Sequence, residues 1–327
     1  MIVFLGKSNH SFTFFIYYNG DKMKIYENIC QLIGHTPIVR LKKIEKKIGT
    51  NNQLYAKLEK FNPGGSIKDR VAYQIIKSGL DEKKINEDTT IIEATSGNTG
   101  IGLAMVCAYY NLKLIIVMSE AVTTERIKLL KLYGAKVVLT KKEEGIEGAI
   151  IEAKRLNQTI ENSFYVNQFG NENNPLSHYL TTAEEIIDDL DNNIDYIFVG
   201  MGSSGTITGI AKKIKEKNKK VKIIGIEPAT CPYYSKREKG NCYIPGIGTT
   251  FLPQIARLDL IDDYITVYDE DAKKSMIELA QEEGALVGVS SGAVINGMKQ
   301  YIAKNKIENK RVLVVLADTG ERYLSII

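Results

Sequence analysis

Short apolar runs recur along the chain and are separated by stretches with helical spacing. The runs cover residues 54–59, 90–93, 112–117, 135–139, 196–199, 221–226 and 311–316. Each has the length of one strand, and most of the intervals between them can hold one helix. Such alternation is typical of α/β proteins, in which mostly parallel sheets are covered by helices. Because no low-complexity linker divides the chain, we expect any second domain to be interwoven with the first.

The first chemical feature is a lysine that follows a glycine-rich turn. Residues 62–70 read NPGGSIKDR and come directly after the first apolar run. Asn-Pro and Gly-Gly interrupt regular structure, and helical spacing resumes at Val71, so Lys68 is predicted to lie where a helix begins. The positive end of the helix dipole disfavours the charged form of the amine and makes it a better nucleophile. A solvated lysine at a helix start is the simpler alternative.

Three further glycine-rich loops each join a strand to a helix, the position at which α/β proteins bind ligands. Residues 93–100 carry hydroxyl and amide groups suited to a carboxylate or a ring oxygen, although a Ser/Thr helix cap would look the same. Residues 199–209 contain more glycines than a tight turn needs and predict a phosphate site. Residues 288–293 again place hydroxyls at a helix start, where capping is the favoured role of this segment taken alone.

The second loop also fits a dinucleotide fingerprint. Gly200, Gly202 and Gly205 have the GxGxxG spacing, and Glu227 stands where an acid would bind a ribose. An NAD-dependent dehydrogenase is therefore an alternative. That interpretation leaves Lys68 and the 95–100 loop without a function, whereas one phosphate and an activated lysine together favour pyridoxal phosphate.

The same segments resemble the signatures of a known family. Residues 62–70, 95–100 (TSGNTG), 202–206 (GSSGT) and 290–292 (SSG) are similar, in order, to motifs of the cysteine synthase and cystathionine β-synthase family of pyridoxal-phosphate enzymes of fold type II. The resemblance covers nearly everything after about residue 24. It implies two interwoven α/β domains, with the cofactor in the cleft between them. The smaller, mobile domain would comprise residues 23–39 and 62–171, the larger 40–61 and 172–327, and residues 1–22 would be an N-terminal extension.

The resemblance also implies a role for each matched position. Lys68 would link covalently to pyridoxal phosphate and then remove the substrate α-proton, Asn98 would bind the cofactor ring hydroxyl, and Ser290 would meet the pyridine nitrogen. The phosphate would be held by Gly202, Ser203, Ser204, Gly205 and Thr206. The substrate would be bound by Thr95, Ser96, Thr99, Gln168 and Gly246.

These roles imply β-replacement on an activated serine or cysteine through an α-aminoacrylate, most simply O-acetylserine and sulfide giving cysteine. The alternative releases hydrogen sulfide from cysteine, as a desulfhydrase, cysteine lyase, or lanthionine or cystathionine synthase does. Two departures from the O-acetylserine enzymes leave substrate choice open: Gly64-Gly65 in the lysine loop, and Pro245 where many relatives carry a polar residue. The family suggests a homodimer.

Composition narrows the classes of protein to which the chain could belong. The chain has 327 residues, 44% of them hydrophobic, enough for a sizeable core. A net charge of +4, with basic and acidic residues mixed, gives no reason to expect nucleic-acid binding. No stretch has the length of a membrane span. The four cysteines lack CxxC spacing and the three histidines are scattered, so we expect no metal site, reduced cysteines and a cytoplasmic enzyme. Cys231 or Cys242 could be a reactive thiol, although packing is favoured without a neighbouring base.

Overall fold

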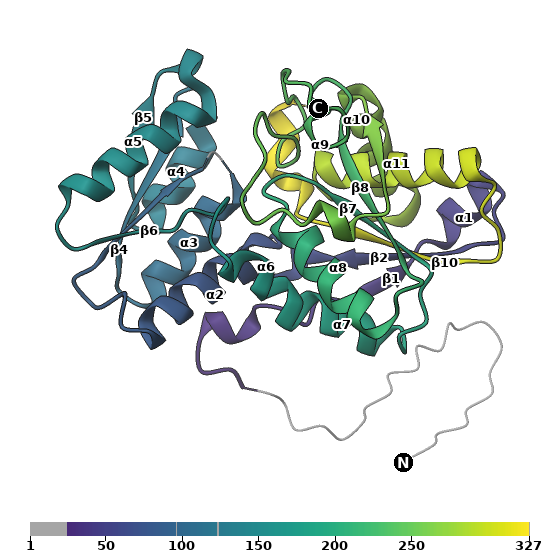
Figure 1. Cartoon of the computed structure of the whole chain (residues 1–327), viewed down its shortest axis with the longest axis horizontal. Coiled ribbons are helices and arrows are strands. Elements are labelled where there is room, and N and C mark those ends of the chain that lie inside the picture. The colour runs from purple at the N-terminus through teal and green to yellow at the C-terminus, as the bar shows by residue number, and fades with distance from the viewer. Residues whose placement is uncertain (1–24, 96, 123, 327) are drawn as a thin grey trace, which may run out of the picture.

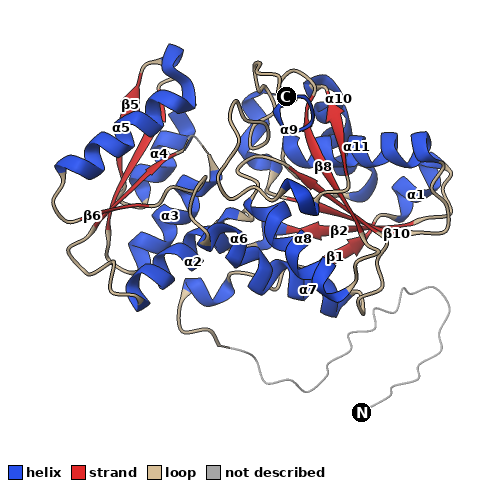
Figure 2. Cartoon of the chain, in the orientation of Figure 1, coloured by secondary structure: helices blue, strands red, loops and turns tan. Residues whose placement is uncertain are grey.

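The computed structural model describes residues 25–95, 97–122 and 124–326, which form two sheets with helices packed on both faces of each (Figures 1 and 2). The expected N-terminal extension, residues 1–22, lies outside this range. The larger sheet has the order β1 (Ile38–Arg40), β2 (Gln53–Leu58), β10 (Arg311–Leu316), β7 (Tyr196–Gly200), β8 (Lys222–Pro228) and β9 (Asp263–Val267). The smaller has the order β5 (Lys136–Thr140), β4 (Lys113–Ser119), β3 (Thr90–Ala94) and β6 (Ser163–Tyr165).

Every neighbouring pair of strands is parallel except β1 and β2. The chain starts in the larger sheet, builds the whole smaller sheet and returns at β7. The prediction of an interwoven, mostly parallel α/β fold is therefore confirmed. The domain limits at residues 39/40, 61/62 and 171/172 stay a prediction.

The α-helices lie between the strands along the chain. They are α1 (Lys42–Ile48), α2 (Lys68–Asp81), α3 (Asn98–Tyr109), α4 (Thr124–Leu132), α5 (Gly145–Thr159), α6 (Asn173–Ser177), α7 (Ala183–Asp189), α8 (Gly205–Lys217), α9 (Tyr233–Lys236), α10 (Asp269–Glu278) and α11 (Val289–Asn305). Short 3-10 or π segments supplement them at Ile29–Leu32, Glu59–Phe61, Lys142–Glu144, His178–Thr182, Leu258–Leu260, Leu279–Glu283 and Gly320–Ile326.

The continuous apolar runs arise because central strands are buried on both faces. In β10, Val312 and Val314 belong to the core beneath α10 and α11, while Leu313 and Val315 belong to the core on the opposite face, beside α8. Successive strand residues point to opposite sides, so most positions of a central strand are apolar. The seven predicted strands are all present, and no end differs from the prediction by more than two residues. The three strands not predicted, β1, β6 and β9, are short edge strands that carry little apolar signal.

Buried ion pairs fix the start of α2. Arg70, 2% exposed, pairs with Glu59 at 2.8 Å and with Glu185 at 2.6 Å. Lys57, fully buried, also pairs with Glu185, at 2.8 Å. Burial pushes the pKa of Glu185 upward, but the ion pairs with Arg70 and Lys57 prevail and lower it to about 2. Charged groups this deeply buried are strongly destabilising when unpaired, so the network restrains the backbone two residues after Lys68.

Candidate active site

A cleft of about 690 Å³ opens between the two sheets, at the carboxyl ends of their strands. Its walls include most of the residues singled out from the sequence, although these are scattered along the chain. They are Lys68, Thr95, Asn98, Thr99, Gln168, Gly202, Ser203, Ser204, Thr206, Gly246 and Ser290. Gly205 lies behind this wall, at the first position of α8. Ser96 lies outside the described residues.

The turn before α2 presents Lys68 to the cleft. Gly65 has a φ of 77°, which favours glycine, and the backbone N–H of Gly64 donates to Asp69 Oδ2 at 2.6 Å. The helix begins at Lys68, as predicted. Burial lowers the pKa of the Lys68 amine from 10.5 to about 8. About a tenth of this amine is therefore neutral, and nucleophilic, at pH 7.

The 202–206 loop forms a cradle at the start of α8. Ser204 adopts a left-handed conformation with a φ of 67°, and the first N–H groups of a helix have no partner within the helix. A Cβ on Gly202 would come within 2.5 Å of the Gly246 carbonyl oxygen, so only glycine allows this close approach of two backbones. Hydroxyls from Ser203 and Thr206 line the same wall. Unpaired N–H groups, hydroxyls and a helix N-terminus are the donor set that binds phosphate.

Two buried residues hold this cradle from behind, and neither was predicted. Asn174 Nδ2 donates to Ser203 Oγ at 3.2 Å, and His178 Nε2 lies 3.2 Å from Thr206 Oγ1. Burial, followed by the charges of Lys68 and Arg70, lowers the pKa of His178 well below its usual range, so the imidazole is neutral.

A second group of polar side chains surrounds the start of α3. Thr99 Oγ1 donates to Gln168 Oε1 at 2.8 Å, which joins the first glycine-rich loop to the segment after β6. Behind them, Glu93 Oε1 accepts a 3.5 Å hydrogen bond from the Gln168 backbone N–H. Burial raises the pKa of Glu93 to about 8, so this carboxyl group is mostly protonated at neutral pH. The site presents hydroxyl and amide groups here without a nearby carboxylate charge, which suits an anionic ligand.

The segment after β10 orients Asn98. Asn98 Nδ2 donates to Asp318 Oδ2 at 2.7 Å, and Arg322 donates to Asn98 Oδ1. Tyr323 also donates to Asp318 Oδ2, at 2.5 Å. These contacts fix which side of the Asn98 amide faces which neighbour. No motif pointed to Asp318 or Tyr323, because they lie more than 200 residues from Asn98 in sequence.

Ser290 and Gly246 form the remaining wall. Ser290 is in the first turn of α11 and is 5% exposed. Gly246 has a φ of 89°, and a Cβ there would lie 3.9 Å from Ser290 Oγ. Ser290 therefore contributes a neutral hydroxyl, not a carboxylate, at the start of its helix.

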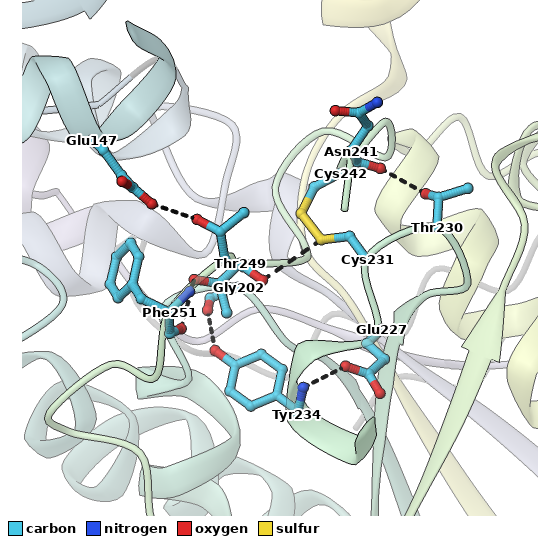
Figure 3. Close-up of a disulfide and its surroundings, with 11 residues drawn as sticks. Glu147, Gly202, Glu227, Thr230, Cys231, Tyr234, Asn241, Cys242, Thr249 and Phe251 are labelled. Carbon is cyan, nitrogen blue, oxygen red and sulfur yellow. Dashed lines mark hydrogen bonds between the residues drawn. A yellow bond between two sulfur atoms is a disulfide. The ribbon is translucent and has the colours of Figure 1, made fainter. Parts of the chain in front are cut away.

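The surroundings of Glu227 contradict its role in dinucleotide binding. The side chain is fully buried and accepts a hydrogen bond from the backbone N–H of Tyr234 at 2.8 Å (Figure 3). It accepts a second from the backbone N–H of Ser235 at 3.0 Å. Both carboxylate oxygens thus stabilise the first turn of α9. Glu227 is unavailable to a ribose.

The prediction that all cysteines are reduced was wrong for two of them. Cys231 and Cys242 form a disulfide, with Cα atoms 5.2 Å apart, within the range that disulfides adopt (Figure 3). The chain folds back between them through α9 and the turn that follows, and eleven residues of separation gave no sequence signal for this pairing. Cys30 and Cys107 are free and buried.

Pyridoxal phosphate requires an amine that reacts with its aldehyde and a site that binds its phosphate. The walls of this one cleft supply both, as a lysine of lowered pKa and a phosphate cradle. The chain belongs to the family of pyridoxal-phosphate dependent enzymes, whose family model matches residues 29–318. It is a pyridoxal-phosphate-dependent, cysteine synthase-like enzyme.

Similar proteins carry more specific names. The chain is 48% identical over 303 residues to cysteine synthase B of Campylobacter jejuni, a match that covers 93% of this chain and 98% of the relative. The crystal structure of an O-acetylserine dependent cystathionine β-synthase from Helicobacter pylori matches with a TM-score of 0.88 and 39% identity, over 93% of this chain and 98% of that one. A hydrogen sulfide-producing enzyme from Fusobacterium nucleatum matches with a TM-score of 0.88 and 41% identity, over 92% and 100%.

None of the described helices is long and apolar enough to cross a membrane. Within the same part of the chain, no three His, Cys, Asp or Glu side chains are grouped so that they could hold a metal ion.

Proposed function

We propose that this enzyme replaces the β-substituent of an activated serine with a sulfur nucleophile, and that its principal reaction converts O-acetylserine and sulfide to cysteine and acetate. The observation that carries the proposal is the placement of Lys68, the 202–206 cradle and the Thr99–Gln168 pair on the walls of one cleft. The names of the relatives, which include cysteine synthases, support the same chemistry.

Each wall of the cleft has a role in this proposal. Lys68 binds the cofactor covalently and, once freed by substrate, takes the proton from the substrate α-carbon. Thr95, Ser96, Thr99, Gln168 and Gly246 bind the substrate, and Asn98 binds the cofactor ring hydroxyl. Gly202, Ser203, Ser204, Gly205 and Thr206 hold the phosphate, and Ser290 meets the pyridine nitrogen. Bound pyridoxal phosphate supplies the electron sink for bonds at the substrate α-carbon.

A serine, Ser290, at the position proposed to meet the pyridine nitrogen favours elimination over other pyridoxal chemistry. A neutral hydroxyl does not force protonation of the pyridine nitrogen as a carboxylate would, so charge at the α-carbon is less stabilised. Rapid loss of a good β-leaving group is then preferred to the accumulation of that charge.

The proposed reaction also requires that water be excluded from the cleft. The unsaturated amino acid that remains after loss of the β-substituent would otherwise hydrolyse. We propose that the smaller domain closes on the larger once substrate binds. A contact across the cleft supports this motion: Thr250 Oγ1, on the loop that carries Gly246, donates to Glu147 Oε1 of α5 at 2.9 Å. The domain limits given above are part of this proposal.

A second candidate reaction releases hydrogen sulfide from cysteine and adds water or another thiol. Gly64-Gly65 in the lysine turn and Pro245 beside Gly246 depart from the O-acetylserine enzymes, and one structural relative is named as a hydrogen sulfide producer. The resemblance also supports a cytoplasmic homodimer, which sedimentation of the purified protein would test.

The experiment compares two substrate sets on the purified holoenzyme. The first is O-acetylserine with sulfide, read as cysteine and acetate; the second is cysteine alone, read as sulfide and serine. We expect faster turnover of the first set and no turnover by Lys68→Ala with either. Faster sulfide release from cysteine would transfer the assignment to the second reaction, and turnover of neither set by wild type would refute the proposal.

A further inference from the structure

The disulfide joins the end of β8 to the loop that walls the cleft. Cys231 follows β8 by three residues, and Cys242 begins residues 242–251, which we call the wall loop. All ten residues of the wall loop line the cleft. Gly246 and Thr250, which carry the substrate contact and the cross-cleft contact proposed above, both belong to it. A covalent bond therefore ties the substrate side of the cleft to the larger sheet (Figure 3).

The two cysteines differ in exposure. Cys231 is fully buried, whereas Cys242 is exposed. Attack on a disulfide requires access to one sulfur along the direction opposite the other. Because Cys242 is exposed and lines the cleft whereas Cys231 is buried, we expect attack at Cys242 Sγ, with Cys231 as the leaving group.

The surroundings of Cys242 favour an anionic attacker. Cys242 also lines an adjoining cavity of about 440 Å³ whose described walls include Arg126, Lys142 and Arg322 and no Asp or Glu. Three cations raise the local concentration of a small anion. They also stabilise the persulfide anion that forms on Cys242.

A partner is already in place for the sulfur that leaves. Cys231 Sγ lies 3.6 Å from the Thr249 carbonyl oxygen, so the released thiol can donate a hydrogen bond to the wall loop. Neighbouring contacts, such as the 2.7 Å hydrogen bond from Thr230 Oγ1 to the Asn241 carbonyl, do not involve the sulfur atoms. Opening of the disulfide therefore loosens the wall loop without dismantling it.

We propose that the Cys231–Cys242 disulfide is an exchange site for small thiolates at the mouth of the cleft, with hydrosulfide as the principal attacker. The hydrosulfide sulfur bonds to Cys242 Sγ, the Cys231–Cys242 bond breaks, and its electron pair leaves on Cys231, which takes a proton from water. Hydrosulfide is oxidised to the outer sulfur of a Cys242 persulfide and Cys231 is reduced, so no further oxidant is needed. Reverse attack by Cys231 expels hydrosulfide and restores the disulfide.

The identity of hydrosulfide as attacker rests on the proposed function, whereas the exchange site rests on the geometry alone. A reversible disulfide also agrees with the proposed cytoplasmic location, where lasting disulfides are rare and those that occur are mostly catalytic or redox-sensing. Exchange would let sulfide itself alter the cleft that uses it.

Peptide mapping of the holoenzyme tests the exchange directly. Protein purified without reductant is incubated with sodium hydrosulfide, alkylated with a reagent that caps thiols and persulfides, and digested with trypsin. Lys236, Arg237 and Lys239 lie between the two cysteines, so the disulfide links two tryptic peptides. We expect linked peptides before treatment and, after it, an additional sulfur on the Cys242 peptide and an alkylated thiol on the Cys231 peptide. The Cys30 and Cys107 peptides are internal controls that should gain no sulfur.

Three results would overturn the proposal: unlinked, fully alkylated peptides before treatment; linked peptides that hydrosulfide leaves unchanged; or the additional sulfur on Cys231. Limited proteolysis provides the conformational readout. Hydrosulfide should speed cleavage near Lys239 in wild type and leave Cys231→Ser/Cys242→Ser unaffected, and equal responses would contradict release of the wall loop. Because neither readout needs turnover, an enzyme inactive on O-acetylserine would refute the proposed function and leave this test intact.

Discussion

Replacement of Lys68 by methionine should stabilise the cofactor-free protein in a pH-dependent way. Burial lowers the pKa of this amine from 10.5 to about 8, so the folded state releases a proton that the unfolded chain keeps between those two pH values. Below pH 8 the wild type therefore carries the full cost of a buried charge, about 3 kcal/mol at ~1.36 kcal/mol per pH unit. Above pH 8 its stability rises with pH, because the unfolded state binds more protons. Lys68→Met has no such group.

The assay is urea unfolding of cofactor-free wild type and Lys68→Met at pH 7, 8 and 9. The advantage of the variant should be largest at pH 7 and smaller by about 1 kcal/mol at pH 9. Lys212→Met, on the exposed surface of α8, serves as the control for losing a lysine. A Lys68→Met advantage that is constant across this range would refute the assignment of a desolvated, easily neutralised amine to Lys68.

Three further outcomes follow from the cradle. His178→Leu removes the partner of Thr206 Oγ1 and should weaken cofactor binding about fivefold in fluorescence titrations, since a lost hydrogen bond costs about 1 kcal/mol. Because His178 is already neutral, wild-type affinity should show no histidine titration between pH 6 and 8. Unchanged affinity of the variant would contradict the support role. Gly205→Ala would drive its Cβ into Asn174 Oδ1, a fully buried side chain, and should cost about 1–3 kcal/mol in thermal or urea unfolding with loss of cofactor binding; a variant as stable as wild type would show that the loop has room. Removal of pyridoxal phosphate should lower the free energy of unfolding by about 2.7 kcal/mol relative to protein held with the cofactor at a hundredfold excess over its Kd. The shift in the urea midpoint measures this difference. Identical midpoints would mean that the folded state does not bind the cofactor selectively.

The sequence predicted those parts of the fold that have a local signal. Central strands are buried on both faces and mostly apolar, so the runs at 196–199 and 311–316 were visible in the sequence. The edge strand β9 was not, because only two of its five residues are buried. Lys68 and the glycine-rich loops stood out because turns and helix starts restrict residue choice locally.

The supporting contacts of the site had no such signal. Asp318 reaches Asn98 only because β10 ends beside the lysine turn, where Ser66 and Asp318 form a β-bridge. His178 supports Thr206 from a helix that packs against α8, and a lone histidine in sequence gave no reason to expect this contact. The disulfide likewise depends on a chain reversal that only the folded structure reveals.

The most direct test of the central claim is to locate the cofactor on the chain. Borohydride reduction of the holoenzyme makes the bond between the cofactor and its lysine permanent, and peptide mass mapping then identifies that lysine. We predict the label on the peptide that contains Lys68 and on no other, with loss of the label in Lys68→Ala. A label on another lysine, or none on a protein saturated with pyridoxal phosphate, would contradict the assignment of Lys68 and of the cleft it faces.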